Sequence, residues 1–355
     1  MPAIACDAMV ARRTFFVALL MAVVFTPSAA SAQLPSSTPY ALVLDLYRAG
    51  EARTALLNLA KLTSDQIASG KDTLLKAVDS PIPAEAERAA ASMRIAALVH
   101  TERAIGLRGG DDTPEWRHQI GVARAYAEKL ASRDRGAGFP RTWWLLVTAY
   151  LQGEFALATA KEFGEWAQHS VGDDPELLLA IGATQEMGWT EHEANGDFPF
   201  NGDLKDAERA YRHALAAQPD LVEARLRLGR VLTLRGDTRG AVRLLAEIGE
   251  RAEREYQYLA RMFEGDAFER MGNDAEAERR YLAATALLPE AQAAHLGLAQ
   301  VRHKRGARAE AAESVRATTQ GKTVTDTSEP WFWYSRGLSR HTSRYLDELL
   351  AMVRP

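Results

Sequence analysis

Glu191, His192, Glu193 and Asp197 are the residues of this sequence whose types could most readily do chemistry. Carboxylates beside an imidazole can supply acid and base groups, so a catalytic site in this segment is one hypothesis. Adjacent residues of a chain point in different directions, however, and no nucleophile, base and orienting group can be argued together here. An enzyme with its site in this segment is therefore the least favoured function.

Glu193, Asn195 and Asp197 also alternate somewhat like the ligands of a calcium loop. Such a loop needs a glycine directly after them, and Phe198 stands at that position. His295 and His303 are two helical turns apart with no third ligand in reach. We predict no metal and no cofactor, and we interpret the histidines as surface residues.

No HExxH, GxSxG, P-loop or paired-cysteine spacing occurs after residue 32. The elements that must position any site are helices, because the strong helix formers Ala, Leu, Arg and Glu dominate while Val, Ile and Thr are sparse. The hydrophobic share of 47% and the charged share of 25% are typical of globular proteins. The composition predicts an all-α protein, and the missing motifs favour a noncatalytic one.

The N-terminus has the three-part pattern of a secretory signal peptide. Arg12 and Arg13 precede an apolar run from Phe15 to Phe25, which is too short to span a membrane, and the small residues Ala30 to Ala32 follow. We expect cleavage before Gln33 and a periplasmic or secreted mature protein.

Two details of this segment bear on export. The residues from Arg12 to Phe16 resemble a twin-arginine motif, so general secretion and twin-arginine export both stay open, although the apolar run fits general secretion better. Cys6 lies inside the predicted signal peptide, so the mature chain is expected to contain neither a disulfide nor a catalytic thiol.

The formal net charge of the chain is −4. A weakly acidic chain lacks the strong positive field that binds phosphate backbones. Nucleic acid is therefore not expected as a partner.

An internal repeat with a period near 34 residues runs through the second half of the chain. Its first segment has the order of a second helix: Asp206-Ala207, Tyr211, Ala214-Leu215 and Pro219. Three further units carry apolar, small or turn residues at matching offsets: Leu228-Gly229, Leu232, Gly236-Asp237, Ala241 and Leu245; Gly265, Phe268, Gly272, Ala277, Tyr281, Ala284 and Pro289; and Leu298-Ala299, Gly306, Ala311 and Val315.

The pattern resembles the tetratricopeptide repeat (TPR) family in its exported bacterial form. An imperfect upstream unit is close to the family's opening W-x-x-L-G-x-x-Y, with Trp143, Leu146 and Tyr150 in place and Val147 instead of the glycine, and Ile181-Gly182 opens the next unit. Five repeats are recognisable between Arg141 and Thr318, about half the chain. The resemblance implies a right-handed superhelical solenoid of antiparallel helix pairs with a concave groove.

Other parts of the chain follow the repeat less closely. Leu42, Leu46, Gly50, Ala55 and Leu59 look like a degenerate repeat. Within the array, the turn glycines Gly236, Gly272 and Gly306 are expected to be left-handed. The predicted divisions are a signal peptide at 1–32, a helical region at 33–137, the repeat array at 138–320 with an insertion at 188–203, and a linker with an aromatic capping helix at 321–355.

The resemblance also places a binding site, because the first helix of each TPR unit lines the groove. The usual exposed positions correspond here to Arg230, Thr233, Asp266, Glu269, Arg270, His303 and Lys304. The asparagines that clamp a C-terminal carboxylate in some TPR domains are missing, and Arg227, Phe263 and Gly297 stand in one such row. The expected partner is a protein or peptide bound as an extended segment or helix.

Two departures from the repeat have two interpretations each. Trp189, Phe198 and Phe200 in the insertion fold back on the helices or contact a partner, and the two interpretations are compatible. The aromatic run from Trp331 to Tyr334, after a polar linker from Gly321 to Ser328, either covers the last apolar face of the solenoid or forms an exposed interaction patch.

The function predicted from the sequence is a noncatalytic interaction scaffold of the cell envelope or secreted space. The alternative from another class is an accessory subunit of an envelope enzyme or export complex that is inactive alone.

Overall fold

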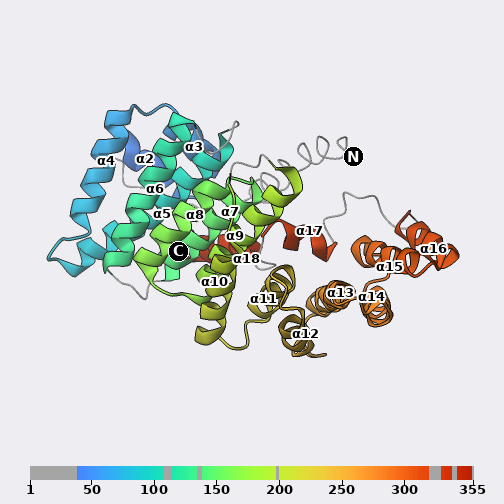
Figure 1. The fold of residues 1–355 in the computed structure, drawn as a ribbon. Helices are drawn as coiled ribbons and strands as arrows, with labels where there is room; N and C mark the ends of the chain where they lie inside the picture. Colours follow the sequence, from blue (N-terminus) through green and yellow to red (C-terminus); the bar gives the residue numbers. More distant parts are fainter. Residues whose placement is uncertain are drawn as a thin grey trace. The chain divides into compact units, whose positions relative to one another are not determined.

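The computed structural model describes residues 38–107, 113–133, 138–196, 200–319, 329–337 and 342–353. These residues form seventeen α-helices, labelled α2 to α18, and no strand (Figure 1). The prediction of an all-α protein is confirmed. The predicted signal peptide, the linker from Gly321 to Ser328, and Asp197 and Phe198 lie outside the described residues.

None of the helices within the described ranges combines the length and apolar character that crossing a membrane requires. The chain divides into two compact units. Unit 1 contains residues 1–159, 169–172 and 341–355, and unit 2 contains residues 160–168 and 173–340.

Unit 1 begins with the helix pair α2 (Pro39–Arg48) and α3 (Ala52–Leu59), which confirms the helix pair predicted around Gly50. Gly50 lies between them with φ of +86°. The remaining helices of unit 1 are α4 (Ser64–Ala77), α5 (Pro83–Gly106), α6 (Pro114–Arg133), α7 (Gly138–Gly153) and α18 (Thr342–Val353), and α18 packs against α7 and α5. α7, which the sequence places in the repeat array, thus belongs to unit 1, and α8 (Leu157–Val171) has residues in both units.

A buried polar cluster joins three helices of unit 1. His100 of α5 is fully buried, and its ring nitrogens make hydrogen bonds of 2.9 Å with the Tyr40 hydroxyl and 2.5 Å with Oε1 of Gln119. The Tyr40 hydroxyl also bonds that of Tyr126, at 2.9 Å. The interpretation of the histidines as surface residues is therefore wrong for His100, whose partners come from α2 and α6.

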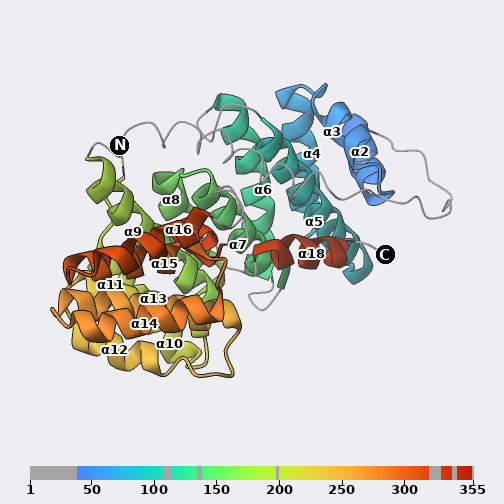
Figure 2. The same cartoon turned by 90° about the vertical axis from the view of Figure 1, so that its right-hand side faces the viewer.

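Unit 2 consists of successive helix pairs (Figure 2). Their bounds are α9 (Pro175–Asn195) with α10 (Leu204–Ala217), α11 (Val222–Leu234) with α12 (Thr238–Ala246), α13 (Arg254–Arg270) with α14 (Asp274–Leu287), and α15 (Gln292–Lys304) with α16 (Arg308–Thr319). The short helix α17 (Pro330–Ser335) follows. The predicted solenoid of helix pairs is confirmed in this unit.

Small residues allow the helices of each pair to approach closely. A Cβ atom on Gly229 would lie 2.6 Å from the Leu245 side chain, and one on Gly265 would lie 2.7 Å from the Tyr281 ring. The predicted left-handed turns are also confirmed, since φ is +91° at Gly236, +75° at Gly272 and +83° at Gly306.

The segment predicted as an insertion is helical over its first half. α9 continues through Asn195 and ends at Gly196, where φ is +72°, because no glycine or proline interrupts residues 189–195. Trp189 packs against the cluster formed by α9 to α12, and a Cβ on Gly188 would collide with the Phe200 ring. The fold-back interpretation is confirmed for Trp189 and Phe200.

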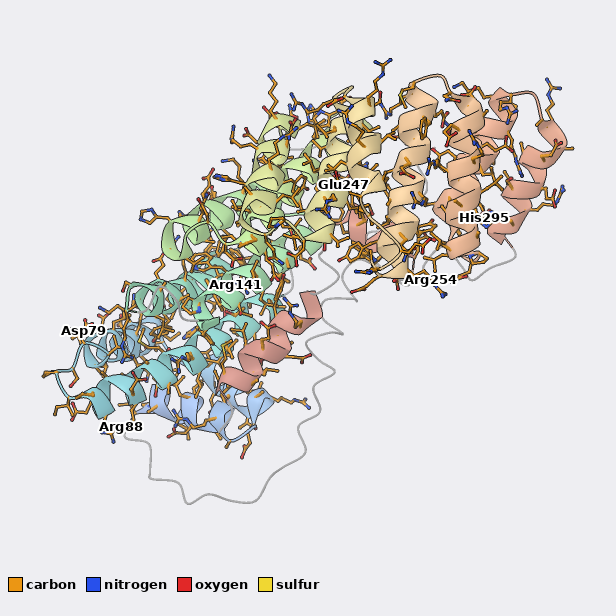
Figure 3. All side chains as sticks on the ribbon, turned by 90° about the horizontal axis from the view of Figure 1, so that it is seen from below. Asp79, Arg88, Arg141, Glu247, Arg254 and His295 are labelled. Carbon is orange, nitrogen blue, oxygen red and sulfur yellow. The ribbon has the colours of Figure 1, made fainter. Side chains whose placement is uncertain are left out.

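Charged side chains of both signs cover the exposed helix faces, including Arg88, Glu247 and Arg254 (Figure 3). This mixed surface agrees with the weak net charge.

Candidate binding groove

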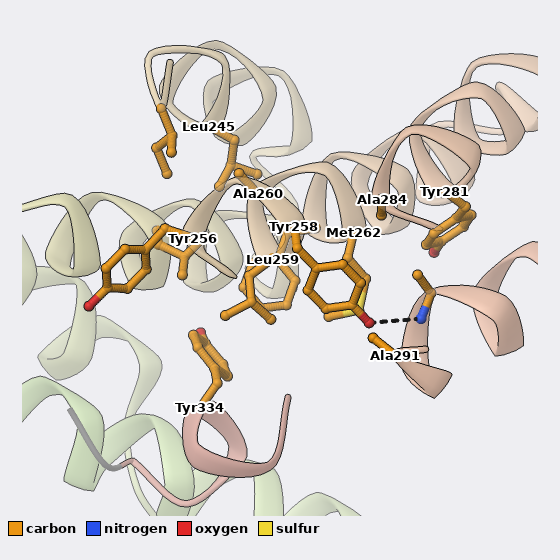
Figure 4. Packing of buried hydrophobic residues seen from close by; sticks show 14 of the residues in the cluster. Leu245, Tyr256, Tyr258, Leu259, Ala260, Met262, Tyr281, Ala284, Ala291 and Tyr334 are labelled. Atoms are coloured by element: carbon orange, nitrogen blue, oxygen red, sulfur yellow. Dashed lines mark hydrogen bonds between the residues drawn. The ribbon is translucent and has the colours of Figure 1, made fainter. Parts of the chain in front are cut away.

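The first helices of the unit 2 pairs, α9, α11, α13 and α15, form a common face on which α17 lies. α11 contacts α9 and α13, and α13 contacts α15. Residues 329–337, which we call the aromatic segment, touch all four helices through the contacts given below. Figure 4 shows Tyr334 of this segment in one buried cluster with Tyr256 and Leu259 of α13.

Glu186 of α9 is the centre of a buried polar network beneath the aromatic segment. Only 1% of its side chain is exposed. Its carboxylate accepts hydrogen bonds from the hydroxyls of Tyr211 at 2.7 Å and Tyr334 at 2.6 Å, and from Nη1 of Arg230 at 2.7 Å. Nη1 of Arg227 lies 3.7 Å from the same carboxylate.

Arg227 of α11 is equally buried and links the network to the aromatic segment. Its Nε donates to Glu223 at 3.0 Å, and its Nη1 donates to the Tyr334 carbonyl at 3.4 Å. The guanidinium lies 4.3 Å from the centre of the Tyr334 ring. Burial acts to lower the pKa of Arg227, but the charge of Glu223 and the other acidic groups outweighs it, so the net shift is upward and the residue stays charged.

Arg230 of α11 carries the other positive charge. Its guanidinium centre is 5.1 Å from the Trp331 ring, 5.5 Å from Tyr334 and 5.9 Å from Phe263. These distances are within the range of cation–π attraction, which is strongest over tryptophan.

The network is balanced in charge. Glu186 and Glu223 oppose Arg227 and Arg230, and Oε2 of Glu223 also accepts a 3.2 Å hydrogen bond from the Tyr256 hydroxyl. Because these four charges cancel, uncharged aromatic side chains can cover the network without burying a net charge away from water. Burial and the nearby Glu186 raise the pKa of Tyr334 well above its usual value, so its hydroxyl keeps the proton that it donates.

The aromatic rings pack against each other and against α13. Trp331 and Tyr334 are stacked with centroids 5.6 Å apart, and Phe263 meets Tyr334 edge-on at 4.9 Å. Trp333 meets Tyr256 edge-on at 5.8 Å. Such pairs contribute about 0.5–1.5 kcal/mol each beyond the area that they bury.

Glu329 fixes the other end of the aromatic segment. One carboxylate oxygen accepts the backbone N–H of Gln292 at 2.7 Å, and the other accepts the Tyr258 hydroxyl at 3.1 Å. Gln292 is the first residue of α15, and Ala291 before it has no side chain to cap the helix. Glu329 therefore supplies the cap, and its negative charge is favourable at a helix N-terminus.

Gly337 allows the segment to leave the groove close to α9. Its φ is +66°, and a Cβ there would lie 2.1 Å from Sδ of Met187. Both facts favour glycine at this position.

The predicted groove residues fall into two sets. Arg230 lies in the buried network, and Thr233 is also buried, with its hydroxyl bonded to the Gly229 carbonyl at 3.0 Å. Thr233 thus offers no exposed side chain to a partner, because it satisfies its own helix instead.

The other five predicted residues lie toward the far ends of α13 and α15. Arg270 pairs with Asp266 at 3.0 Å, Gln300 donates to Glu269 at 2.8 Å, and Lys304 pairs with Asp274 at 2.7 Å. His303 is exposed. These residues remain predicted contacts for a partner.

Sequence reasoning missed Glu186, Glu223, Tyr256 and Tyr258 as groove residues. The available signal was the row from which the clamp asparagines are missing, since Arg227 and Phe263 of that row both contact the aromatic segment. The prediction of an end cap is wrong, because the aromatic segment lies along α9, α11 and α13 and not beyond α16.

Metal ligands do not gather in the part of the chain that the structure describes: no group of three His, Cys, Asp or Glu side chains is placed to hold an ion. His192 lies on α9, and His295 on α15 bonds the Pro289 carbonyl.

Comparisons with known proteins gave one family match and several similar solved structures. The family model for the tetratricopeptide repeat matches residues 201–262. No curated protein matches the chain. Similar solved structures include MamA from Desulfovibrio magneticus RS-1, residues 41 to the end, with 17% identity, a TM-score of 0.41, and coverage of 53% of this chain and 94% of that one. The MamA RS-1 ArsTM double mutant has 18% identity, a TM-score of 0.40, and coverage of 53% and 94%.

The family match falls on α10 to α13, the region where helix pairs, small packing residues and left-handed turn glycines all follow the repeat. Residues 201–262 of this chain are therefore a tetratricopeptide-repeat region.

Proposed function

We propose that this protein is a noncatalytic scaffold that binds a protein or peptide on the face formed by α9, α11, α13 and α15. The observation that supports the proposal is the aromatic segment, since these residues of the chain itself lie on this face through charged, aromatic and helix-capping contacts. A binding role requires no catalytic group. The buried charged groups of the groove form ion pairs with each other, Arg227 with Glu223 and Arg230 with Glu186.

The proposal includes a place of action in the cell envelope or outside the cell, which rests on the signal-peptide pattern before Gln33. Fractionation of the native host, with N-terminal sequencing of the mature protein, tests this part. A chain that begins at Gln33 in the envelope fraction supports it, and an uncleaved chain in the cytoplasm contradicts it. The weakly acidic charge supports a protein partner over nucleic acid.

Binding is tested by cross-linking the tagged protein in its own cells, identifying a stoichiometric partner, and measuring its affinity with both proteins purified. The variant Arg270→Glu with Lys304→Glu reverses two charges on first helices. The control is Arg243→Glu, an exposed arginine on the second helix α12. We expect the double variant to weaken binding about tenfold and the control to leave it unchanged. Equal binding by all three proteins, or enzymatic turnover by the purified chain, would count against a groove-binding scaffold.

A further inference from the structure

The aromatic segment behaves like a bound peptide more than like another repeat. α17 has six residues, and a helix of that length is not stable on its own in water. Its order therefore comes from the face on which it lies. Residues 329–334 of the aromatic segment contact the four first helices α9, α11, α13 and α15, whereas a repeat unit packs chiefly against its neighbours.

The floor beneath the segment is unusual for a permanent core. Glu186, Arg227 and Glu223 are nearly fully buried there, and α17 covers them. Burying paired charges removes their hydration and stabilises a protein little compared with apolar packing. The buried contacts between the neighbouring helix pairs are formed instead by apolar and aromatic side chains such as Leu, Ala and Tyr. Paired charges regain their hydration when the cover leaves, so this floor suits a site that opens.

The segment is tied to the chain on both sides. Residues 320–328 connect it to α16, and residues 338–341 connect it to α18, which packs on α7 in unit 1. A segment that leaves the groove therefore stays near it, at an effective concentration that reaches roughly millimolar for short linkers. A partner must compete with that concentration.

We propose that the aromatic segment is an intramolecular occupant of the groove and that the partner displaces it with a segment of the same chemistry. This inference rests on the proposed function of the groove. The partner segment carries an acidic residue, a tryptophan two positions later and a tyrosine five positions later, as Glu329, Trp331 and Tyr334 do here.

Each of these three side chains has its own recognition group. The acidic residue caps α15 beside Tyr258. The tryptophan covers Arg230, and the tyrosine donates to Glu186. A segment with this order of residues can bind in one orientation only, because its acidic residue must lie at α15 and its tyrosine at α9.

The probe is a fluorescein-labelled peptide with the sequence of residues 328–336, measured by fluorescence anisotropy against the full mature chain. The variant Trp331→Ala with Tyr334→Ala empties the groove of its own rings while leaving Glu186 and Arg230 in place. We expect this variant to bind the peptide at least tenfold more tightly than the unaltered chain. Peptides in which the glutamate is glutamine, or the tyrosine phenylalanine, should bind the emptied groove more weakly.

A second variant guards against misfolding of the first. Gly337→Ala disfavours the seated segment through the clash with Met187 and the positive φ, and it changes no side chain of the groove. We expect peptide affinity between those of the unaltered chain and the double variant. Circular dichroism spectra that match the unaltered chain establish that both variants are folded.

Four outcomes would overturn the inference. The first is a folded double variant that binds no peptide. The second is equal peptide affinity in all chains. The third is hydrogen exchange of the α17 amides only on global unfolding, which would make the segment a permanent part of the fold. A dimer that forms by exchange of the aromatic segment between two copies would also overturn it. None of these outcomes contradicts the proposed function if the variant Arg270→Glu with Lys304→Glu binds the purified partner more weakly than the unaltered chain does.

Discussion

The hydroxyl of Tyr334 donates a 2.6 Å hydrogen bond to Glu186, a residue 148 positions earlier in the chain. The bond joins the aromatic segment to α9, and the same carboxylate also receives Arg230 and Tyr211. One carboxylate thus connects three helices of the repeat array.

Replacing Glu186 by glutamine should lower the stability of unit 2 strongly. The substitution leaves Arg227 and Arg230 short of one negative charge in a buried site, a change that costs about 3 kcal/mol. Thermal unfolding followed by circular dichroism measures the effect. Glu193→Gln on the same helix is the matched control because its side chain is exposed. Equal melting temperatures for the two variants would refute a central role for Glu186.

Replacing Tyr334 by phenylalanine should loosen the aromatic segment while leaving the ring stacking in place. The loss of one buried hydrogen bond costs about 1–3 kcal/mol. We expect faster hydrogen exchange at the α17 amides. The α14 amides should change little, because the contacts given above for Tyr334 are with α9, α11 and α13. Ser335→Ala serves for comparison, since its hydroxyl bonds only the nearby Phe332 carbonyl among its described contacts.

Replacing Gly265 by alanine should destabilise the third repeat of unit 2. The new Cβ would lie 2.7 Å from the Tyr281 ring, and overpacking of this kind costs about 1–3 kcal/mol. Gly121→Ala is the matched control, because Gly121 is a helical glycine with open space around its missing Cβ. Alanine there should stabilise α6 by up to about 1 kcal/mol through helix propensity. The two substitutions therefore differ in sign, and a gain of stability at Gly265 would contradict the close approach.

Mild acid should destabilise unit 1 through His100. Burial lowers the pKa of His100 to about 4, with the hydrogen bond to Gln119 acting in the opposite direction. His100 binds a proton near pH 6.5 in the unfolded chain but only near pH 4 in the folded chain. The free energy of unfolding is therefore unaffected by this group above pH 6.5 and decreases as the pH falls from 6.5 toward 4. The difference amounts to about 3 kcal/mol.

His100→Gln removes the titrating group and keeps a polar side chain beside Tyr40 and Gln119. Chemical denaturation at several pH values should show a shallower loss of stability between pH 6.5 and 4 in this variant than in the unaltered chain. His169→Gln, at an exposed site on α8, should leave the slope unchanged. Identical slopes in all three proteins would mean that His100 is protonated in the folded state.

The helix pairs could be predicted because their signals are local. Gly236, Gly272 and Gly306 each follow the helix that they end, and the small residue at Gly229 or Gly265 lies about 16 positions from the side chain it accommodates. A repeat brings such positions together by its own period. Pattern alone was therefore sufficient for the helix pairs of unit 2, although not for α7, α8 or the extent of α9.

The occupied groove could not be predicted in the same way. Glu186 and Tyr334 have no periodic relation, and the sequence around Trp331 favours an end cap over an exposed patch. His100 looked like a surface residue because its partners Tyr40 and Tyr126 come from distant helices. Long-range pairs depend on tertiary packing, which one sequence does not encode in its local pattern.

The cap that Glu329 places on α15 makes the last repeat sensitive to what lies in the groove. A segment that brings a carboxylate to Gln292 completes the first turn of α15, whereas a segment without one leaves that turn open to water. The order of the first turn of α15 should therefore depend on whether the segment on this face carries a carboxylate at the position of Glu329.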